Sequence, residues 1–383
     1  MRWSTALSWT VVAAMAIACK RNGRDRAQHP EALGPQAAQN NAADAQSAAA
    51  NTAQTNGAQP TVATNPCDAV FYRAPAGDSI QSITQTTAML LWRERRGILG
   101  WPKPNGPVRV LLANDRVKAL TADEQYLYFA QENGERNGVF RVPIAGGEPE
   151  RMAAIGGMFG LIDDLKSTST HLIMSRGMGE LVRISKSPPF AQQVYSRRDQ
   201  RRNGFGDWAV SEHAAWFGRP SRGLNDAGWV RLDFETGALT AIEGPIARIY
   251  AEGTSALVVR GRAALRVTTD AREREQKLFV VNEATGAVEA APWWTGEPGF
   301  GFAIDGPRVA FSTTVETPEN AMPVLGWLHG TLGGPPPQRF VTCPRGTSMV
   351  RAALRSMFDG NSVFVQVADN NNQHMLMRVR QGS

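Results

Sequence analysis

The sequence predicts an all-β fold, a seven-bladed β-propeller, that follows a signal peptide and a disordered tether. From residue 67 onward, short apolar runs alternate with Gly, Pro, Asn and Asp, as in strands that are joined by turns. One strand pattern recurs seven times in this stretch, and no long segment there has the 3.6-residue periodicity of a helix. Residues 20–66, in contrast, are rich in Ala, Gln, Asn and Thr.

The recurring strand consists of two apolar residues, often an arginine, and then another apolar residue. Clear copies lie at Val139–Val142, Leu181–Ile184, Trp229–Leu232 and Leu376–Val379, and weaker ones at Ile98–Trp101, Leu278–Val281 and Leu325–Leu328. Successive copies are 41 to 51 residues apart.

A second apolar run precedes each copy, at Met89–Trp92, Tyr126–Phe129, His171–Met174, Ala214–Phe217, Ala256–Val259, Val309–Phe311 and Val363–Val367. Two strands and a turn, repeated at this spacing, are typical of the four-stranded blades of a propeller. A single blade cannot bury both of its faces, so we expect neighbouring blades to cover them.

The clearest repeat unit, Thr121–Pro149, carries a more specific pattern. A turn that contains Asp123 leads into the aromatic strand, and Arg141-Val142-Pro143 and the Gly146-Gly147 turn follow. This unit resembles the repeat of bacterial TolB-like and YWTD-like propellers. The resemblance covers residues 67–383 at the level of periodicity, and it implies a fold rather than an activity.

The last copy, His374–Arg380, is the third strand of its blade, and the sequence ends at Ser383. An unused strand lies at the other end of the domain, at Asp68–Ala74. We expect this strand to pair beside His374–Arg380 and so to close the propeller.

Closure would also bring two of the three cysteines together. Cys67 would lie near the junction of the sixth and seventh blades, where Cys343 follows a strand at 339–342. In an oxidising compartment these residues would form a disulfide, and the alternative is a pair of free thiols.

The N-terminus is typical of an export signal. Arg2 precedes an apolar run of 13 residues, Ala6–Ala18, which is shorter than the roughly 20 residues of a transmembrane helix. The run ends in Ala16-Ile17-Ala18-Cys19, which resembles the lipobox of bacterial lipoproteins. The resemblance implies cleavage before Cys19, acylation of Cys19 and a membrane partner. The alternative is an ordinary secretory signal with an incidental cysteine.

Lys20 follows the cysteine, so no aspartate signals retention at the inner membrane. The expected location is therefore the cell envelope, at the outer membrane, on its periplasmic side or at the cell surface. Residues 19–66 would form a disordered tether, because too few apolar side chains are present to offset the entropy of ordering. The tether begins with a basic segment, Lys20 to Arg26, which would solubilise its base or contact anionic headgroups.

Composition and motifs exclude more than they identify. The formal net charge of +6 is small for 383 residues, and it does not indicate a nucleic-acid partner. The sequence contains no HExxH, GxSxG or CxxC motif and no phosphate-binding glycine loop. We assign no catalytic residue, no metal ligand and no cofactor.

Three groups of residues are expected to be structural. The repeated arginines, Arg141, Arg183, Arg231 and Arg378, occupy equivalent positions and should pack between blades and form a repeated hydrogen bond. The tryptophans should pack between blades, with Trp208 and the Trp293-Trp294 pair the least certain. Asp163 and Asp164 are neighbours on a strand, so they are poor candidates for paired acid–base catalysis, and we expect a salt bridge or a turn hydrogen bond.

Basic loops from different blades should converge on one face of the propeller. The longest joins the third and fourth blades and contains Arg197, Arg198, Arg201 and Arg202. Turns between second and third strands add Arg95 and Arg96, and Arg219 and Arg222. This set is a solvated rim, or it accepts an acidic glycan, a lipid headgroup or an acidic protein.

Three functions remain open at this point. The first is a non-enzymatic binding protein of the envelope that uses the propeller as a rigid platform. The second is a lyase or hydrolase that acts on polysaccharide, with residues gathered from several blades at the mouth of the channel. The third is a structural partner in an envelope assembly.

Overall fold

The computed structural model describes residues 70–132, 137–155, 162–176, 180–196, 208–219, 228–242, 255–259, 262–268, 276–296, 302–305, 308–315, 324–342, 352–360, 362–368 and 373–380. These residues belong to one compact unit, Gly57–Ser383. They form strands and turns and no helix, so none of them forms a helix that could span a membrane. Their fold is all-β.

The described strands form seven four-stranded antiparallel sheets that follow one another along the chain. Sheet 1 comprises β2 (Ser82–Gln85), β3 (Met89–Glu94), β4 (Gly97–Pro102) and β5 (Arg109–Leu112). Sheet 2 comprises β6 (Val117–Ala122), β7 (Tyr126–Gln131), β8 (Gly138–Pro143) and β9 (Glu150–Ala154). Sheet 3 comprises β10 (Ile162–Ser167), β11 (His171–Arg176), β12 (Glu180–Ser185) and β13 (Gln192–Ser196).

The remaining sheets have the same order of strands. Sheet 4 comprises β14 (Trp208–Val210), β15 (Ala214–Arg219), β16 (Gly228–Asp233) and β17 (Leu239–Ala241). Sheet 5 comprises β18 (Ser255–Val259), β19 (Arg262–Thr268), β20 (Gln276–Asn282) and β21 (Trp294–Gly296), and sheet 6 comprises β22 (Phe302–Asp305), β23 (Arg308–Val315), β24 (Val324–Thr331) and β25 (Gln338–Thr342). Sheet 7 comprises β26 (Ala352–Asp359), β27 (Ser362–Ala368), β28 (His374–Arg380) and, at its edge, β1 (Val70–Arg73).

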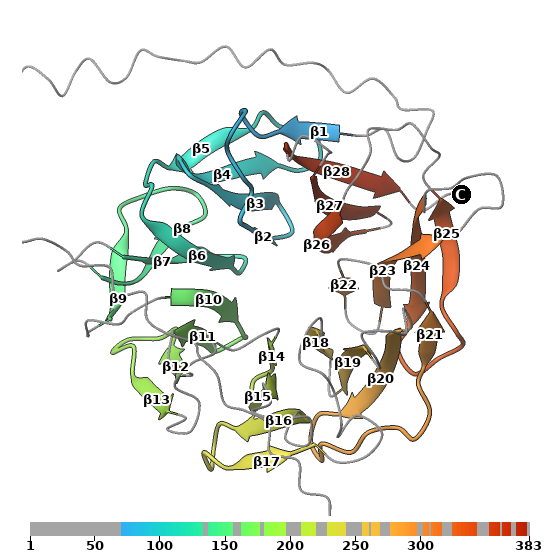
Figure 1. Cartoon of the computed structure of the whole chain (residues 1–383). Helices are drawn as coiled ribbons and strands as arrows, with labels where there is room; N and C mark the ends of the chain where they lie inside the picture. The colour runs from blue at the N-terminus through green and yellow to red at the C-terminus, as the bar shows by residue number, and fades with distance from the viewer. Residues whose placement is uncertain are drawn as a thin grey trace, which may run out of the picture. The chain divides into compact units, whose positions relative to one another are not determined.

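The sheets are arranged around a common centre, with the first strand of each sheet innermost and the last at the periphery (Figure 1). Adjacent inner strands contact each other at β2 and β6, β6 and β10, β14 and β18, β22 and β26, and β26 and β2. Sheets 3 and 4 share a hydrophobic cluster, as do sheets 5 and 6. Each sheet therefore contacts the next, and the last contacts the first, which is the arrangement of a β-propeller.

Pairing of the first and last strands was predicted from the sequence and is confirmed. β1 lies antiparallel to β28, with Val70 opposite Met377, Tyr72 opposite Leu376 and Arg73 opposite Met375. The amide of Ala74 also donates to the carbonyl oxygen of His374, at 2.9 Å. The segment that precedes the repeats thus supplies the outer strand of the last sheet.

The seven recurring third strands correspond to β4, β8, β12, β16, β20, β24 and β28, as predicted. One assignment of a second strand was wrong: Ala256–Val259 lies in β18, the innermost strand of sheet 5, and β19 is the second strand. The physical reason is the composition of β19. Its apolar run, Ala263-Ala264-Leu265, is short, consists mostly of small residues and ends at Arg266, whereas Ala256–Val259 is longer and bulkier.

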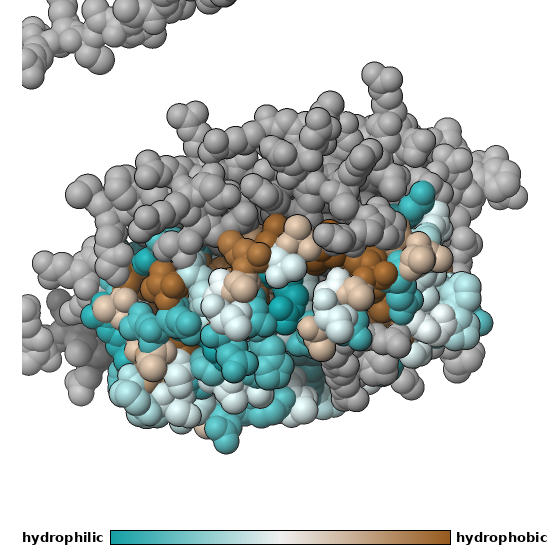
Figure 2. All heavy atoms as spheres, turned by 90° about the horizontal axis from the view of Figure 1, so that it is seen from below, coloured by the Kyte–Doolittle hydropathy of each residue, from teal (hydrophilic) through white to brown (hydrophobic). Residues whose placement is uncertain are grey.

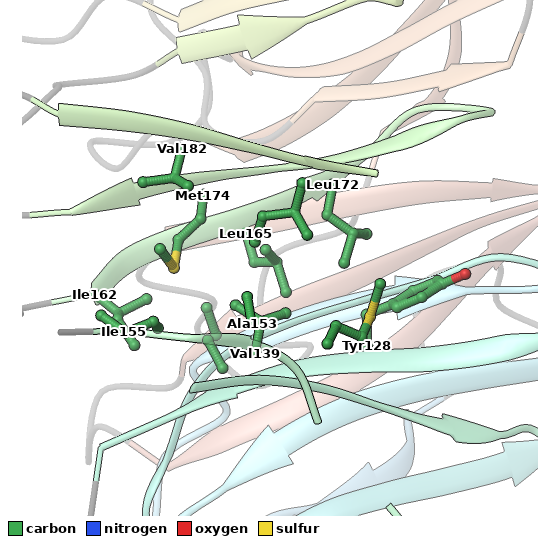
Figure 3. Close-up of a cluster of buried hydrophobic side chains, with 13 residues drawn as sticks. Tyr128, Val139, Ala153, Ile155, Ile162, Leu165, Leu172, Met174 and Val182 are labelled. Carbon is green, nitrogen blue, oxygen red and sulfur yellow. The ribbon is translucent and has the colours of Figure 1, made fainter. Parts of the chain in front are cut away.

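The core lies between sheets, and Figure 3 shows it for sheets 2 and 3. Leu165, Leu172, Met174 and Val182 of sheet 3 face residues of sheet 2 that include Val139. Middle strands such as β11 are buried on both faces, which explains their nearly continuous apolar sequence, Leu172-Ile173-Met174.

The periphery is more polar. Figure 2 shows one side of the molecule, on which most described surface residues are hydrophilic and hydrophobic ones gather in a band. Among the residues whose burial is described, the large hydrophobic side chains that remain exposed are Val110, Val194 and Leu239, on the outermost strands β5, β13 and β17.

Several predicted features lie outside the described residues. These are the signal peptide and tether, Cys19, Cys67, Cys343, Arg197, Arg198, Arg201, Arg202 and Arg222. Lipidation, the disulfide and most of the basic loops therefore stay predictions.

Candidate binding face

The antiparallel order of each sheet divides its connections between two faces. We call the face with the turns between first and second strands, and between third and fourth strands, the turn face. We call the face with the turns between second and third strands, and the connections between sheets, the loop face. Of the predicted binding arginines that the structure describes, Arg95 and Arg96 lie in a turn of the loop face, and Arg219 ends a strand beside it.

Three of the repeated arginines bridge neighbouring sheets at the turn face. Arg141 donates to the carbonyl oxygen of Lys186 at 3.2 Å. Arg183 donates to that of Glu212 at 3.4 Å, and Arg231 donates to that of Glu283 at 3.3 Å. Each bond joins one sheet to a turn of the next, so the predicted repeated hydrogen bond is confirmed for these three arginines and not for Arg378.

Aromatic rings cover the guanidinium groups of the same arginines. The Arg141 guanidinium lies 4.6 Å from the ring centroid of Tyr126 and 4.8 Å from that of Phe190. The Arg183 guanidinium lies 5.2 Å from the ring centroid of Phe234. These stacked and hydrogen-bonded cations stabilise the contacts between sheets and are not available to a ligand.

Arg378 differs from the other three. It pairs with Asp359 of its own sheet, at 3.0 Å. Lys103 of sheet 1 reaches the same carboxylate at 3.1 Å, so Asp359 joins sheets 7 and 1.

At the turn face, carboxylates also connect turns of neighbouring sheets through hydrogen bonds. Glu212, between β14 and β15, accepts hydrogen bonds from Thr168, Ser169 and Thr170, which connect β10 and β11 in the preceding sheet. Burial raises the pKa of Glu212, but the hydrogen bonds from Ser169, Thr170 and Thr168 outweigh it and lower the pKa to about 2. The carboxylate is therefore ionised at any physiological pH.

On the loop face, Arg95 and Arg96 lie in the turn between β3 and β4. Arg95 is exposed, its backbone amide donates to Asp78 Oδ1 at 3.1 Å, and its guanidinium has no partner among the described residues. Arg96 donates to Glu94 Oε2 at 3.0 Å and to the hydroxyl of Tyr72 at 2.9 Å, with 45% of its side chain exposed. The two neighbours thus differ in how free they are to bind a ligand.

Glu94 explains the position of Arg96. Its side chain is completely buried, and it accepts hydrogen bonds from Trp92 Nε1, at 2.9 Å, and from the hydroxyl of Tyr72. Burial raises the pKa of Tyr72, and the hydrogen bond to Glu94 raises it further, so the phenol stays protonated and donates. Arg96 supplies the charge that a buried carboxylate requires.

Carboxylates also gather on the loop face beside sheets 2 and 3. Burial and the charges of Asp164 and Glu132 raise the pKa of Asp163. Lys166 pairs with Asp164 at 3.2 Å, as expected, and Lys118 pairs with Glu132 at 3.7 Å. A β-bulge between Ile162 and Asp164 interrupts the alternation of side chains. Sequence analysis missed Glu132, whose only signal was its place in a turn.

The described residues contain no group of three or more His, Cys, Asp and Glu side chains that could hold a metal ion. Arg219 is the last residue of β15, opposite Gly228, at the end of the strand beside the loop face.

The uncertain tryptophans pack between sheets, as predicted. Trp208 is 6% exposed and belongs to the cluster between sheets 3 and 4. Trp293 Nε1 donates to the carbonyl oxygen of Gly334, at 3.0 Å, in sheet 6. Trp294 packs against Phe311 with ring centroids 4.8 Å apart.

These features define a β-propeller whose turn face is occupied by contacts between sheets and whose loop face presents charged side chains. No protein-family model matches the sequence, and no curated protein matches it.

Solved structures share the fold at low identity. An oligogalacturonate lyase in complex with manganese has a TM-score of 0.55 and 12% identity, covering 78% of this chain and 87% of that chain. A structure of YCF48 bound to D1 peptide has a TM-score of 0.54 and 12% identity, covering 84% of this chain and 99% of that chain. TolB from Acinetobacter baumannii matches with a TM-score of only 0.38, at 11% identity, covering 75% of this chain and 60% of that chain. The first two likenesses show the fold alone.

Proposed function

We propose that the protein is a lipid-anchored binding protein of the cell envelope, in which a seven-bladed propeller is the platform for an acidic partner. Residues 1–18 would be a signal peptide, Cys19 the acylated anchor and residues 19–66 the tether. The seven sheets, which contact one another in sequence order, would be the seven blades of one closed domain from residue 67 to residue 383.

One observation carries the binding role. Among the described arginines, Arg141, Arg183 and Arg231 are held at the turn face, while Arg95 is exposed on the loop face without a partner among the described residues. The sequence adds Arg197, Arg198, Arg201 and Arg202 to connections of the loop face. This face is therefore the one we propose for an acidic glycan or an acidic envelope protein.

The test is a salt titration of binding by the full chain in detergent, with polygalacturonate and polyglutamate as acidic probes. Binding should weaken steeply with salt, because exposed charges are screened over about 10 Å at 0.1 M. Changing Arg197, Arg198, Arg201 and Arg202 to Ser should weaken binding by about tenfold without lowering the melting temperature. If this variant binds both probes as tightly as the parent does, these arginines only form a solvated rim and do not bind an acidic partner.

Arg95 and Arg96 provide a matched pair for the same experiment. Arg95→Ser should weaken binding and leave stability unchanged. Arg96→Ser should lower stability as well, because it removes the partner of buried Glu94. Equal stability of the two variants would show that Arg96 has no structural role.

The anchor has a separate test. Mass spectrometry of the mature protein should show an acylated N-terminal Cys19, and Cys19→Ser should abolish membrane association. If the mature protein begins at another residue and carries no acyl group, the prediction of a lipid anchor at Cys19 is wrong. Cys67 and Cys343 should be unreactive to alkylation until a reductant is added.

An enzymatic role is the alternative, and one observation favours it. The raised pKa of Asp163, beside Asp164 and Glu132, is the kind of shift found in catalytic carboxyl groups. This alternative predicts cleavage of an acidic polysaccharide by the parent protein and loss of cleavage in Asp163→Asn. If the parent protein does not cleave the acidic polysaccharide, the enzymatic alternative is wrong and the binding role stands.

A further inference from the structure

We infer that protonation of His171 weakens the junction between sheets 3 and 4, so that mild acid loosens this part of the propeller. This junction lies at the turn face, so the inference is independent of the acidic partner proposed for the loop face. A hydrogen-bonded chain fixes the tautomer of His171, cations lie near its ring, and one of these cations also holds sheet 4.

His171 begins β11, directly after the turn that Glu212 binds. The hydroxyl oxygen of Thr170 lies 2.7 Å from Glu212 Oε2 and 2.6 Å from His171 Nδ1. Because the carboxylate of Glu212 is ionised, it can only accept, so the single hydroxyl proton of Thr170 is donated to Glu212. The hydroxyl oxygen must then accept a hydrogen bond from Nδ1. The neutral ring therefore carries its hydrogen on Nδ1, and the lone pair that takes up a proton is on Nε2.

Cations from β12 and from the turn after it lie near this ring. Nη2 of Arg183 is 3.3 Å from His171 Nδ1. Since Nδ1 already carries a hydrogen, it offers no lone pair to the guanidinium group. Lys186, whose Nζ lies 2.7 Å from Asp123 Oδ2, adds a second positive charge, and Glu212 opposes both with a negative one. The surroundings of His171 are thus unfavourable for a further positive charge.

The balance of these effects favours the neutral ring. Burial lowers the pKa of His171, the charges of Arg183 and Lys186 lower it further, and Glu212 offsets only part of the lowering. The unfolded chain takes up this proton at the ordinary pKa of 6.5, and the folded protein takes it up only at a lower pH. The stability that neutral His171 contributes is therefore complete above pH 6.5 and is lost as the pH falls towards the lowered pKa.

Arg183 transmits this change to sheet 4. Its guanidinium donates to the carbonyl oxygen of Glu212 at 3.4 Å, which is longer than the usual range of about 2.7–3.2 Å, and it stacks on Phe234. A positive charge on His171, within hydrogen-bond distance of Nη2, repels the group that makes both contacts. Acid therefore weakens the contacts of Arg183 with sheet 4, while Glu212, with a pKa of about 2, stays ionised.

The tautomer and the titration of His171 are tested by nitrogen NMR of the full chain in detergent, with isotope-labelled histidine. The signals of His171 are assigned by their loss in His171→Asn. They should show a hydrogen on Nδ1 at about pH 8 and should titrate below the ordinary histidine pKa of about 6.5. A hydrogen on Nε2 at that pH, or a midpoint at or above the ordinary value, would overturn the inference.

The effect on stability is measured by urea unfolding of the full chain from about pH 8 to about pH 5. His171→Asn keeps a donor for Thr170 but cannot titrate. The urea midpoint of the parent should therefore decrease, relative to that of His171→Asn, as the pH falls. His374→Asn is the matched control, because His374 is also half-buried but lies beside the amide of Gln366, at 3.4 Å, and its midpoint should follow the parent. If the parent and His171→Asn lose stability in parallel, the inference is wrong.

The role of Arg183 is tested in Arg183→Met, which needs no change at His171. Removal of the guanidinium should raise the pKa of His171 in the NMR titration, because the nearest like charge is gone. It should also make the decrease of the urea midpoint between about pH 8 and about pH 5 smaller than in the parent. An unchanged pKa and an unchanged pH dependence in Arg183→Met would show that charge on His171 does not act on Arg183, and would overturn the coupling to sheet 4.

Discussion

The hydroxyl of Tyr72, on the first described strand, donates a hydrogen bond to Glu94 Oε1, in a side chain that is completely buried. Tyr72 belongs to β1, which completes sheet 7, and Glu94 ends β3 of sheet 1. This bond therefore joins the last sheet to the first. Arg96 and Trp92 provide the other hydrogen bonds of the carboxylate.

Tyr72→Phe should lower the free energy of unfolding by about 1–2 kcal/mol, because it removes one donor from a buried carboxylate. Tyr126→Phe is the control, since the hydroxyl of Tyr126 has no partner among the described residues and its loss should change stability little. Chemical denaturation of both variants measures the difference. Equal midpoints for Tyr72→Phe and the parent would show that the bond does not stabilise the junction.

Deletion of residues 67–76 should destabilise the domain by about 3–5 kcal/mol or prevent folding, because it removes buried aromatic contacts. Phe71 stacks on Trp101 with centroids 4.8 Å apart and packs edge-on against Phe364 at 5.6 Å. Deletion of residues 27–60 should leave the melting temperature unchanged. Thermal melts of the two proteins decide the matter, and equal melting temperatures would refute closure by β1.

Arg183→Met should destabilise the protein by about 1–3 kcal/mol, because Arg183 donates to Glu212 of the next sheet and stacks on Phe234. Arg183→Lys should restore only part of this stability, since an ammonium group cannot stack and bond in the same geometry. Arg95→Met, at an exposed site, should change stability by less than about 0.5 kcal/mol. Unfolding by urea gives all three values, and a neutral Arg183→Met would contradict the role between sheets.

Glu212→Gln should reveal a pH-dependent contribution to stability. The folded-state pKa, about 2, lies below the unfolded value of 4.5, so the carboxylate stabilises the protein above pH 4.5 and loses this effect as the pH falls towards 2. Since the carboxylate is only partly buried and solvent screens it, we expect about 1 kcal/mol at pH 7. The difference between parent and variant should shrink between these pH values in urea titrations. Exposed Glu235→Gln should show no such trend, and a constant difference for Glu212→Gln would refute the assignment.

The sequence repeat predicted the positions of most second and third strands, but not of all. Hydrophobic runs such as Leu172-Ile173-Met174 predicted the middle strands correctly, because strands buried on both faces must be apolar throughout. The same reasoning failed at β19, where only Ala263-Ala264-Leu265 is continuous and Arg266 follows. A run of apolar residues therefore identifies a second strand only where it is the longest run of its repeat.

The sequence by itself determined the all-β class, the repeat length, the pairing of the first strand with the last and the structural role of Arg141, Arg183 and Arg231. These features depend on composition and spacing, which recur along the chain. Only the tertiary structure decided that Arg96 is bonded to Glu94 while Arg95 is not, and that Glu132 lies near Asp163. These relationships depend on burial and on contacts between sheets: Glu94 is bonded by Tyr72 of the last sheet, and Glu132 and Asp163 belong to neighbouring sheets. No local pattern encodes which of two adjacent arginines meets a buried carboxylate.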